Sequence, residues 1–243
     1  MTNIIPDVPS PIDLRNIKDA EQWANEVNIK RPWRYAFFEY YACLINDLSG
    51  GRVLRVLELG SGPGYLAEYL LEHCANIQYT AFDFSKAMQN LSIRKLLTKS
   101  NIGLGDIDSE DIEHYCFADK EQENLKHIQV GNHQCTFIIG DFKQTDWTDV
   151  IANKFDVIII HQALHELRHK QHASHFHAAI KQNLMHEQSI YLVCDHLCAE
   201  HAMQNNQLYM SQNEHLHCLK TAGFNSVKIA LERQGLCLFS VQN

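Results

Sequence analysis

The stretch Glu58-Leu59-Gly60-Ser61-Gly62-Pro63-Gly64 decides the fold of this chain. It lies between the apolar run Val53 to Leu57 and a helical pattern from Tyr65 to Cys74. This order predicts a buried strand, a glycine turn and a helix. Glycines adopt backbone angles closed to other residues, and the free N–H groups at a helix start suit a carboxylate or phosphate. The stretch therefore predicts a nucleotide-like ligand, and the alternative is a tight turn without one.

The rest of the chain continues the alternation of strands and helices. Further strands are expected at 78–82, 136–139, 155–160, 190–194, 227–231 and 236–241. Helices are expected at 85–97, in a histidine-rich segment that runs to about 184, and at 211–222. The last two strands have only a short link between them, so the final one should run antiparallel. The predicted fold class is α/β: a three-layer, doubly wound, mostly parallel seven-stranded sheet with an antiparallel last strand.

The segments outside this pattern predict two further regions. Residues 1–50 are expected to form an N-terminal helical arm or cap, and 51–243 the ligand-binding domain. Acidic residues crowd into an insertion at about 100–126. The insertion is interpreted as a solvated segment, and the alternatives are a lid over the site or a contact with a cationic partner.

Charge and hydropathy bear on the partners. The chain has 243 residues and a formal net charge of -8, which argues against a nucleic-acid substrate because phosphate binding needs a concentrated positive field. No apolar run has the length of a membrane span, and the start lacks the pattern of a signal peptide. We therefore expect no membrane partner and a cytoplasmic location.

Asp83 is the expected partner of the glycine turn. It ends the second strand, and a carboxylate there can accept hydrogen bonds from ribose hydroxyls. The alternative is that Asp83 caps the next helix. A nicotinamide dinucleotide is the alternative ligand, but its fingerprint spaces the glycines G-x-G-x-x-G, whereas here the spacing is G-x-G-x-G.

Four segments together resemble one known family. They are Val56-Leu57-Glu58-Leu59-Gly60-Ser61-Gly62-Pro63-Gly64, Phe82-Asp83, Ile139-Gly140-Asp141-Phe142, and Phe155-Asp156-Val157-Ile158-Ile159-Ile160-His161. In this order they resemble the class I S-adenosylmethionine-dependent methyltransferases of small-molecule type, over residues 53–241. The resemblance implies S-adenosyl-L-methionine as the cofactor. It places Glu58 and Gly60 at the methionyl part, Asp83 at the ribose, and Asp141 and Phe142 at the adenine. The remaining expected cofactor-binding residues are Ser61, Gly62, Gly64, Phe84 and His161.

The histidines after the fourth expected strand are the candidates for catalysis. His161 ends that strand, and Leu164-His165-Glu166 resembles the leucine-histidine-acid element of small-molecule O-methyltransferases, although Leu167 stands where a tryptophan is usual. We predict His165 as the general base, with His161 as a second catalytic candidate. A metal held by histidines at near-helical spacing was the competing hypothesis, and no metal is expected.

The methyl acceptor is expected to be a small molecule that is methylated at oxygen. The residues expected to close or line its pocket are Trp33, Arg34, Phe38, His196 and Tyr209. The alternative for the aromatic members is that they fill the core. A homodimer is the assembly considered. The alternative function is a non-catalytic cofactor sensor or assembly module, whereas a protein or RNA methylase is disfavoured by the charge and by His161-Gln162-Ala163-Leu164 after the fourth strand.

Overall fold

A computed structural model describes residues 5–100, 112–118 and 123–243. The chain forms two compact units. The N-terminal unit is Ile12–Asp141. The C-terminal unit is discontinuous in sequence, because it consists of the residues up to Pro11 together with Phe142–Asn243. The expected separation of 1–50 from 51–243 stays a prediction, and most of the expected acidic insertion at 100–126 lies outside the described residues.

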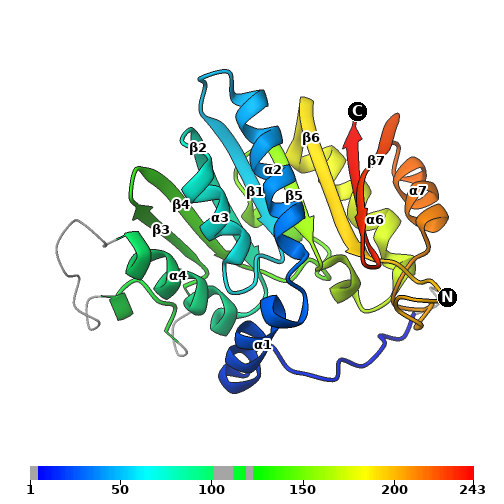
Figure 1. Ribbon diagram of the computed structural model, residues 1–243, viewed down its shortest axis with the longest axis horizontal. Coiled ribbons are helices and arrows are strands. Elements are labelled where there is room, and N and C mark those ends of the chain that lie inside the picture. The colour runs from blue at the N-terminus through cyan, green and yellow to red at the C-terminus, as the bar shows by residue number, and fades with distance from the viewer. Residues whose placement is uncertain (1–4, 101–111, 119–122) are drawn as a thin grey trace. The chain divides into compact units, whose positions relative to one another are not determined.

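The N-terminal unit alternates helices and strands (Figure 1). Its elements are α1 (Ile17–Lys30), α2 (Arg34–Ser49), β1 (Leu54–Leu59), α3 (Tyr65–His73), β2 (Ile77–Asp83), α4 (Lys86–Ser100), β3 (Leu125–Val130) and β4 (His133–Ile139). Strand β1 pairs in parallel with β2, and β2 in parallel with β4. The glycine turn thus follows a buried strand and precedes a helix, as predicted.

The sequence pattern predicts seven strands, but the described residues form eight. The additional strand is β3. It pairs antiparallel with β4. Only Ile128 and Val130 of this strand are buried, so its apolar signal is weak. Gly131 and Asn132 form the two-residue connection, and Gly131 has a φ of 56°, which is typical of a tight hairpin turn. This turn was the signal that could have revealed the hairpin.

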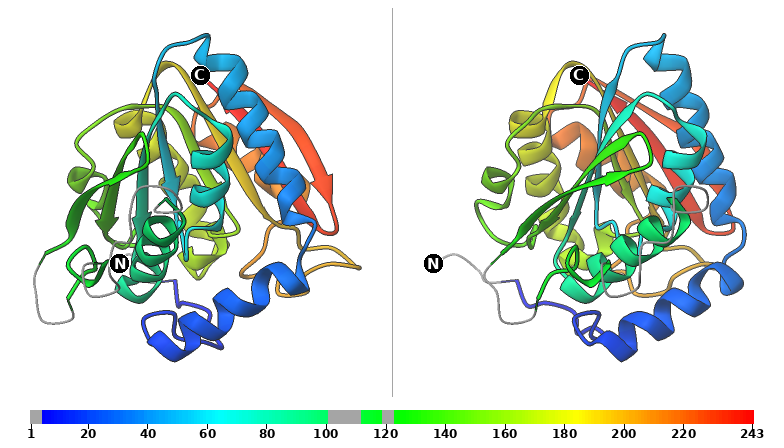
Figure 2. Two further views of the ribbon diagram at one scale, coloured as in Figure 1. Left: turned by 60° about the vertical axis from the view of Figure 1, so that its left-hand side comes forward. Right: turned by 90° about the vertical axis from the view of Figure 1, so that its left-hand side faces the viewer.

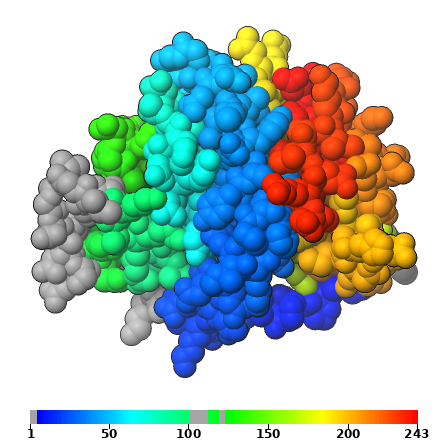
Figure 3. All heavy atoms as spheres, in the orientation of Figure 1, coloured from blue at the N-terminus to red at the C-terminus, as the bar shows by residue number. Residues whose placement is uncertain are grey.

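The helices of the N-terminal unit begin and pack as the sequence indicates. Ser85 precedes α4, and its Oγ accepts a hydrogen bond from the N–H of Met88, as predicted for a cap. Helices α1 and α2 meet at a sharp bend (Figure 2), and α2 lies beside α3 with their atoms forming one continuous surface (Figure 3). No helix in the described ranges is long and apolar enough to cross a membrane.

The C-terminal unit contains the other half of the strands. Its main elements are β5 (Phe155–His161), α6 (Ala173–Ala179), β6 (Met185–His196), α7 (Gln212–Thr221), β7 (Ser226–Arg233) and β8 (Leu236–Gln242). Strand β5 pairs in parallel with β6, while β8 pairs antiparallel with both β6 and β7. The predicted α/β class and the antiparallel last strand are therefore confirmed.

The histidine-rich segment differs from the single helix that was expected. Two short 3₁₀ turns, Leu164–Leu167 and Lys170–His172, come before α6. The cause lies in the backbone, because Gln162 and Arg168 have φ values of 56° and 62°, a conformation that interrupts a right-handed helix. The histidines that follow β5 therefore do not share one helical face, which removes the spacing argument for a metal. Among the described residues, no group of three or more His, Cys, Asp or Glu side chains could hold a metal ion.

Candidate active site

The glycine turn takes its shape from the backbone angles of its three glycines. Gly60, Gly62 and Gly64 have φ values of 67°, 56° and 78°, in the left-handed region that favours glycine. The N–H of Gly60 donates to the carbonyl oxygen of Phe82 at 2.8 Å. A Cβ on Gly64 would come within 2.2 Å of Oγ of Ser92 on α4, whereas a Cβ on Gly62 would meet nothing within 4 Å. The turn is thus packed tightly at Gly64 and open at Gly62.

Asp83 joins three loops of the N-terminal unit. Its carboxylate accepts hydrogen bonds from the N–H groups of Gly62 and Ser85, at 2.8 and 2.9 Å. Its carbonyl oxygen accepts from the N–H of Gly140 at 3.0 Å. The loops after β1, β2 and β4 are therefore fastened at this one buried residue. The bond to Ser85 corresponds to the capping alternative, and the ribose role of Asp83 stays a prediction.

Glu58 is buried near the end of β1. The hydroxyl of Tyr79 donates a hydrogen bond to its carboxylate. Burial raises the pKa of Glu58 to about 8, against the opposing effects of the Tyr79 hydrogen bond and the positive charge of Arg34. Glu58 therefore retains its proton near neutral pH in the absence of a ligand.

The predicted lid residues of the first two helices lie in an aromatic environment. Arg34 is buried, and its Nη1 donates to Oδ1 of Asn28 at 2.7 Å. Its guanidinium carbon lies 5.3 Å from the ring centre of Phe38 and 5.9 Å from that of Trp23. Phe38 is fully buried, and Trp33 is half-buried. Phe38 thus belongs to the core of the helical layer, which was the alternative weighed for it.

The predicted adenine-binding residues belong to two different units. In the N-terminal unit, the guanidinium of Arg15 lies 3.7 Å from Asp141 and 4.6 Å from the ring centre of Phe84. In the C-terminal unit, the side chain of Phe142 is buried against Phe176, with ring centres 5.2 Å apart. Arg15 is not among the predicted site residues, because a single arginine in the turn before a helix carries no motif.

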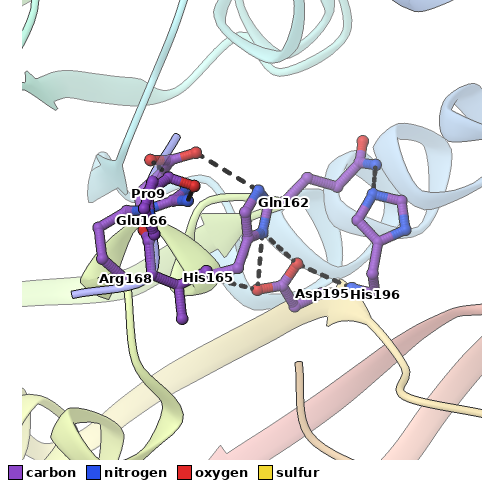
Figure 4. A network of polar contacts seen from close by, with 8 residues as sticks. Pro9, Gln162, His165, Glu166, Arg168, Asp195 and His196 are labelled. Atoms are coloured by element: carbon purple, nitrogen blue, oxygen red, sulfur yellow. Dashed lines mark hydrogen bonds and ion pairs between the residues drawn. The ribbon is translucent and has the colours of Figure 1, made fainter. Parts of the chain in front are cut away.

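The C-terminal unit holds a buried pair of His165 and Asp195 (Figure 4). Nδ1 of His165 lies 2.8 Å from Oδ1 of Asp195, and the His165 N–H donates to Oδ2 at 2.8 Å. Asp195 comes from the end of β6, and the N–H of His196 donates to its Oδ1 at 2.7 Å. Three N–H or ring-nitrogen contacts therefore converge on one carboxylate.

This pairing shifts the pKa of both groups. Burial lowers the pKa of His165, but the negative charge and hydrogen bond of Asp195, together with Glu166, outweigh it and leave a raised pKa. Burial raises the pKa of Asp195, but attraction to His165 outweighs it, and the result is about 2. Asp195 is therefore ionised at neutral pH and stabilises a proton on His165.

Other polar and aromatic side chains surround His165. Its Nε2 lies 3.5 Å from Oε1 of Glu166. The ring centres of Tyr209 and His196 lie 5.3 and 5.9 Å from that of His165, so these three predicted residues come together. Gln162 bonds to the ring of His196 at 2.9 Å. His161, the other catalytic candidate, is buried at the end of β5.

From the sequence, Asp195 is expected to reach the ligand crevice, either to orient the acceptor or to bond to loop N–H groups, whereas Gln162 is not among the predicted site residues. Asp195 stands at a strand end, as Asp83 does, and this position was the available signal. Gln162 carries no comparable signal, because its place in the site depends on a left-handed backbone.

Comparison with known proteins gives a family and a fold. A family model described as methyltransferase domain matches residues 33–240. No curated protein matches the chain.

Among solved structures, human N-acetylserotonin methyltransferase in complex with SAM has 15% identity and a TM-score of 0.59, and the match covers 95% of this chain and 57% of that one. This chain thus spans little more than half of that neighbour. The DhpI–SAH complex has 17% identity and a TM-score of 0.57, with 94% and 95% covered. A TehB-like SAM-dependent methyltransferase from Corynebacterium glutamicum has 10% identity and a TM-score of 0.55, with 94% and 100% covered.

The family model confirms the expectation of a methyltransferase domain, and the solved structures confirm the expected fold. The chain belongs to the methyltransferase domain family.

Proposed function

We propose that this protein transfers a methyl group from S-adenosylmethionine to a hydroxyl oxygen of a small molecule, with His165 as the general base. The observation that carries the proposal is the buried pair of His165 and Asp195. Because Asp195 occupies Nδ1 of the imidazole, Nε2 is the nitrogen left to accept a proton from an acceptor. The expected cytoplasmic location and homodimer stay predictions of the sequence.

Two features of the glycine turn fit the cofactor. Oγ of Ser61 is buried and has no hydrogen-bond partner among the described residues, and a buried polar group without a partner indicates a missing ligand contact. The space at Gly62 is open, which allows a close approach to its main chain. We therefore assign Glu58, Ser61, Gly62 and Asp83 to the cofactor, as the family resemblance implies.

The proposed reaction is an in-line displacement. When bound, S-adenosylmethionine supplies a methyl group on a positively charged sulfur. Glu58, Ser61, Gly62 and Asp83 would hold the cofactor, which would supply the methyl group, while Nε2 of His165 would take the proton that the acceptor hydroxyl gives up. Asp195 stabilises the imidazolium that results, and it keeps the ring in one tautomer and orientation.

The test is methyl transfer from tritium-labelled S-adenosylmethionine to a panel of small phenols, catechols and aliphatic alcohols, with matched amines and thiols. We expect labelled product from at least one hydroxyl compound. His165→Ala should lower the turnover of that compound by about 10²- to 10⁴-fold. The dissociation constant for S-adenosylhomocysteine should change by less than about threefold.

His201→Ala is the matched control, because His201 is an exposed histidine of the same unit. It should leave both turnover and cofactor affinity unchanged. Full turnover in His165→Ala would remove the base role. Binding of S-adenosylhomocysteine without transfer to any compound of the panel would instead favour the cofactor-sensing module.

A further inference from the structure

Residues 5–11 form an arm that is fastened to the C-terminal unit by polar contacts. The N–H of Val8 donates to the carbonyl oxygen of Arg168 at 2.8 Å. In return, Nε of Arg168 donates to the carbonyl oxygen of Val8 at 2.9 Å, and Nη2 to that of Pro9 at 2.8 Å. Asp7 adds an ion pair with Lys143 at 2.9 Å. The arm has no fully buried residue among positions 5–11, so these polar contacts hold it.

Arg168 is strained and buried where it meets the arm. Its φ is 62° and it is 7% exposed. A left-handed conformation is costly for a residue with a side chain, and it persists where surrounding contacts fix it. The three hydrogen bonds to Val8 and Pro9 are such contacts.

The same guanidinium also reaches the surroundings of the proposed base. Nη1 of Arg168 lies 3.4 Å from Oε2 of Glu166. The other oxygen of that carboxylate, Oε1, lies 3.5 Å from Nε2 of His165. Figure 4 shows this chain of contacts, from the arm at Pro9 through Arg168 and Glu166 to His165 and Asp195. Glu166 is thus held between a fixed cation and Nε2 of His165, the nitrogen proposed to take the acceptor proton.

We propose that Arg168 is a positioning residue: it ties the arm to Glu166 and thereby holds this carboxylate beside Nε2 of His165. The effect of Arg168 on catalysis rests on the proposed function, whereas its contacts with the arm and with Glu166 do not. Glu166 would then stabilise the proton that His165 takes from the acceptor. A carboxylate in a fixed place does this without reorganising during the reaction.

The charged groups around His165 make the proposal measurable. Those that face it are Asp195 and His196 from β6, Tyr209 from the segment after β6, and Glu166 and Arg168 from its own turn. Glu166 raises the pKa of His165, and Arg168 lowers it. Removing Arg168 therefore has two opposing effects on this pKa, and only a double-mutant cycle separates them.

The experiment is a histidine NMR titration of the full chain in wild type, Glu166→Gln, Arg168→Gln and the double variant. In the Arg168 background, Glu166→Gln should lower the pKa of His165. In the Arg168→Gln background the same change should have no measurable effect, because the carboxylate is no longer held in place. An equal effect in both backgrounds would overturn the proposal. No turnover is needed, so this outcome is independent of whether the hydroxyl acceptor was assigned correctly.

A second pair of variants tests the arm without altering Arg168. Val8→Pro removes the N–H that donates to Arg168, whereas Val8→Ala keeps it. The effect of Glu166→Gln on the His165 pKa should shrink in the proline variant and persist in the alanine variant. If both variants keep the full effect, the arm has no part in the positioning. Once a methyl acceptor has been identified, Arg168→Gln should lower kcat by about tenfold with little change in KM. Arg168→Lys should lower kcat less than Arg168→Gln does.

Discussion

Glu58 and Asp195 are both buried carboxylates near the carboxyl ends of strands, yet their pKa values move in opposite directions. Glu58, in the N-terminal unit, has a phenol hydroxyl as its hydrogen-bonding partner, and burial dominates, so its pKa rises to about 8. Asp195, in the C-terminal unit, bonds to an imidazole and two backbone N–H groups, and its pKa falls to about 2 despite equal burial. The partners, rather than the burial, decide the charge of a carboxylate.

The comparison also separates the two proposed tasks. A carboxylic acid that keeps its proton can form hydrogen bonds with a ligand, such as the methionyl part of the cofactor, but it offers that ligand no negative charge. An ionised carboxylate against a histidine can stabilise an imidazolium. Near neutral pH the side chain of Glu58, beside the glycine turn, is therefore neutral, whereas that of Asp195, beside His165, is negatively charged.

The largest effect is expected from replacing each carboxylate by its amide. Asp195→Asn should lower the pKa of His165, measured by NMR, and should reduce turnover by about 10²- to 10⁴-fold. Glu58→Gln should change cofactor affinity by no more than about tenfold, because an amide resembles a protonated acid. Equal losses in the two variants would contradict the difference in charge that we assign to these carboxylates.

The next effect concerns the backbone of the glycine turn. Gly64→Ala should destabilise the protein by about 2–5 kcal/mol, since its Cβ would overlap Ser92 at a positive φ. Gly62→Ala is the matched control for the positive φ: it should cost about 1 kcal/mol of stability, while its Cβ enters the open space. Urea unfolding measures the stability, and titration with S-adenosylhomocysteine measures the affinity. Similar losses of stability in both variants would show that the contact with Ser92 is unimportant.

A third effect is a dependence of stability on pH. The pKa of Glu58 is about 8 in the folded protein, against the ordinary value of 4.5 for a glutamate. Between these values the unfolded chain has released a proton that the native state keeps, so this group makes stability fall as pH rises, by about 1.4 kcal/mol per pH unit. The wild type should therefore lose stability relative to Glu58→Gln between pH 5 and 8 in urea unfolding.

Asp195→Asn provides the contrast in the same experiment. The folded pKa of Asp195, about 2, and its ordinary value of 3.8 both lie below this range, so the titration of Asp195 itself adds no slope. The raised pKa of His165, which depends on Asp195, adds one only above the ordinary histidine pKa of 6.5. A constant difference between wild type and Glu58→Gln over the range would contradict the raised pKa of Glu58.

The two regions also differ in how far their structure could be predicted. The shape of the glycine turn depends on backbone angles and strand ends, which glycine spacing and apolar runs encode locally. The surroundings of His165 depend on side chains brought together from distant segments, such as Asp195 and Pro9. Periodicity predicted a helix there, but the left-handed backbones of Gln162 and Arg168 prevent it. No local sequence pattern predicts a left-handed backbone conformation that is stabilised by tertiary contacts.

The discontinuous C-terminal unit has a consequence for the order of synthesis. Val8 emerges from the ribosome 160 positions before Arg168, its partner, which is roughly 10–30 s at ordinary translation rates. The N-terminal unit, Ile12–Asp141, is complete before that partner is made. The contacts of the arm with Arg168 must therefore wait until the whole N-terminal unit has been made.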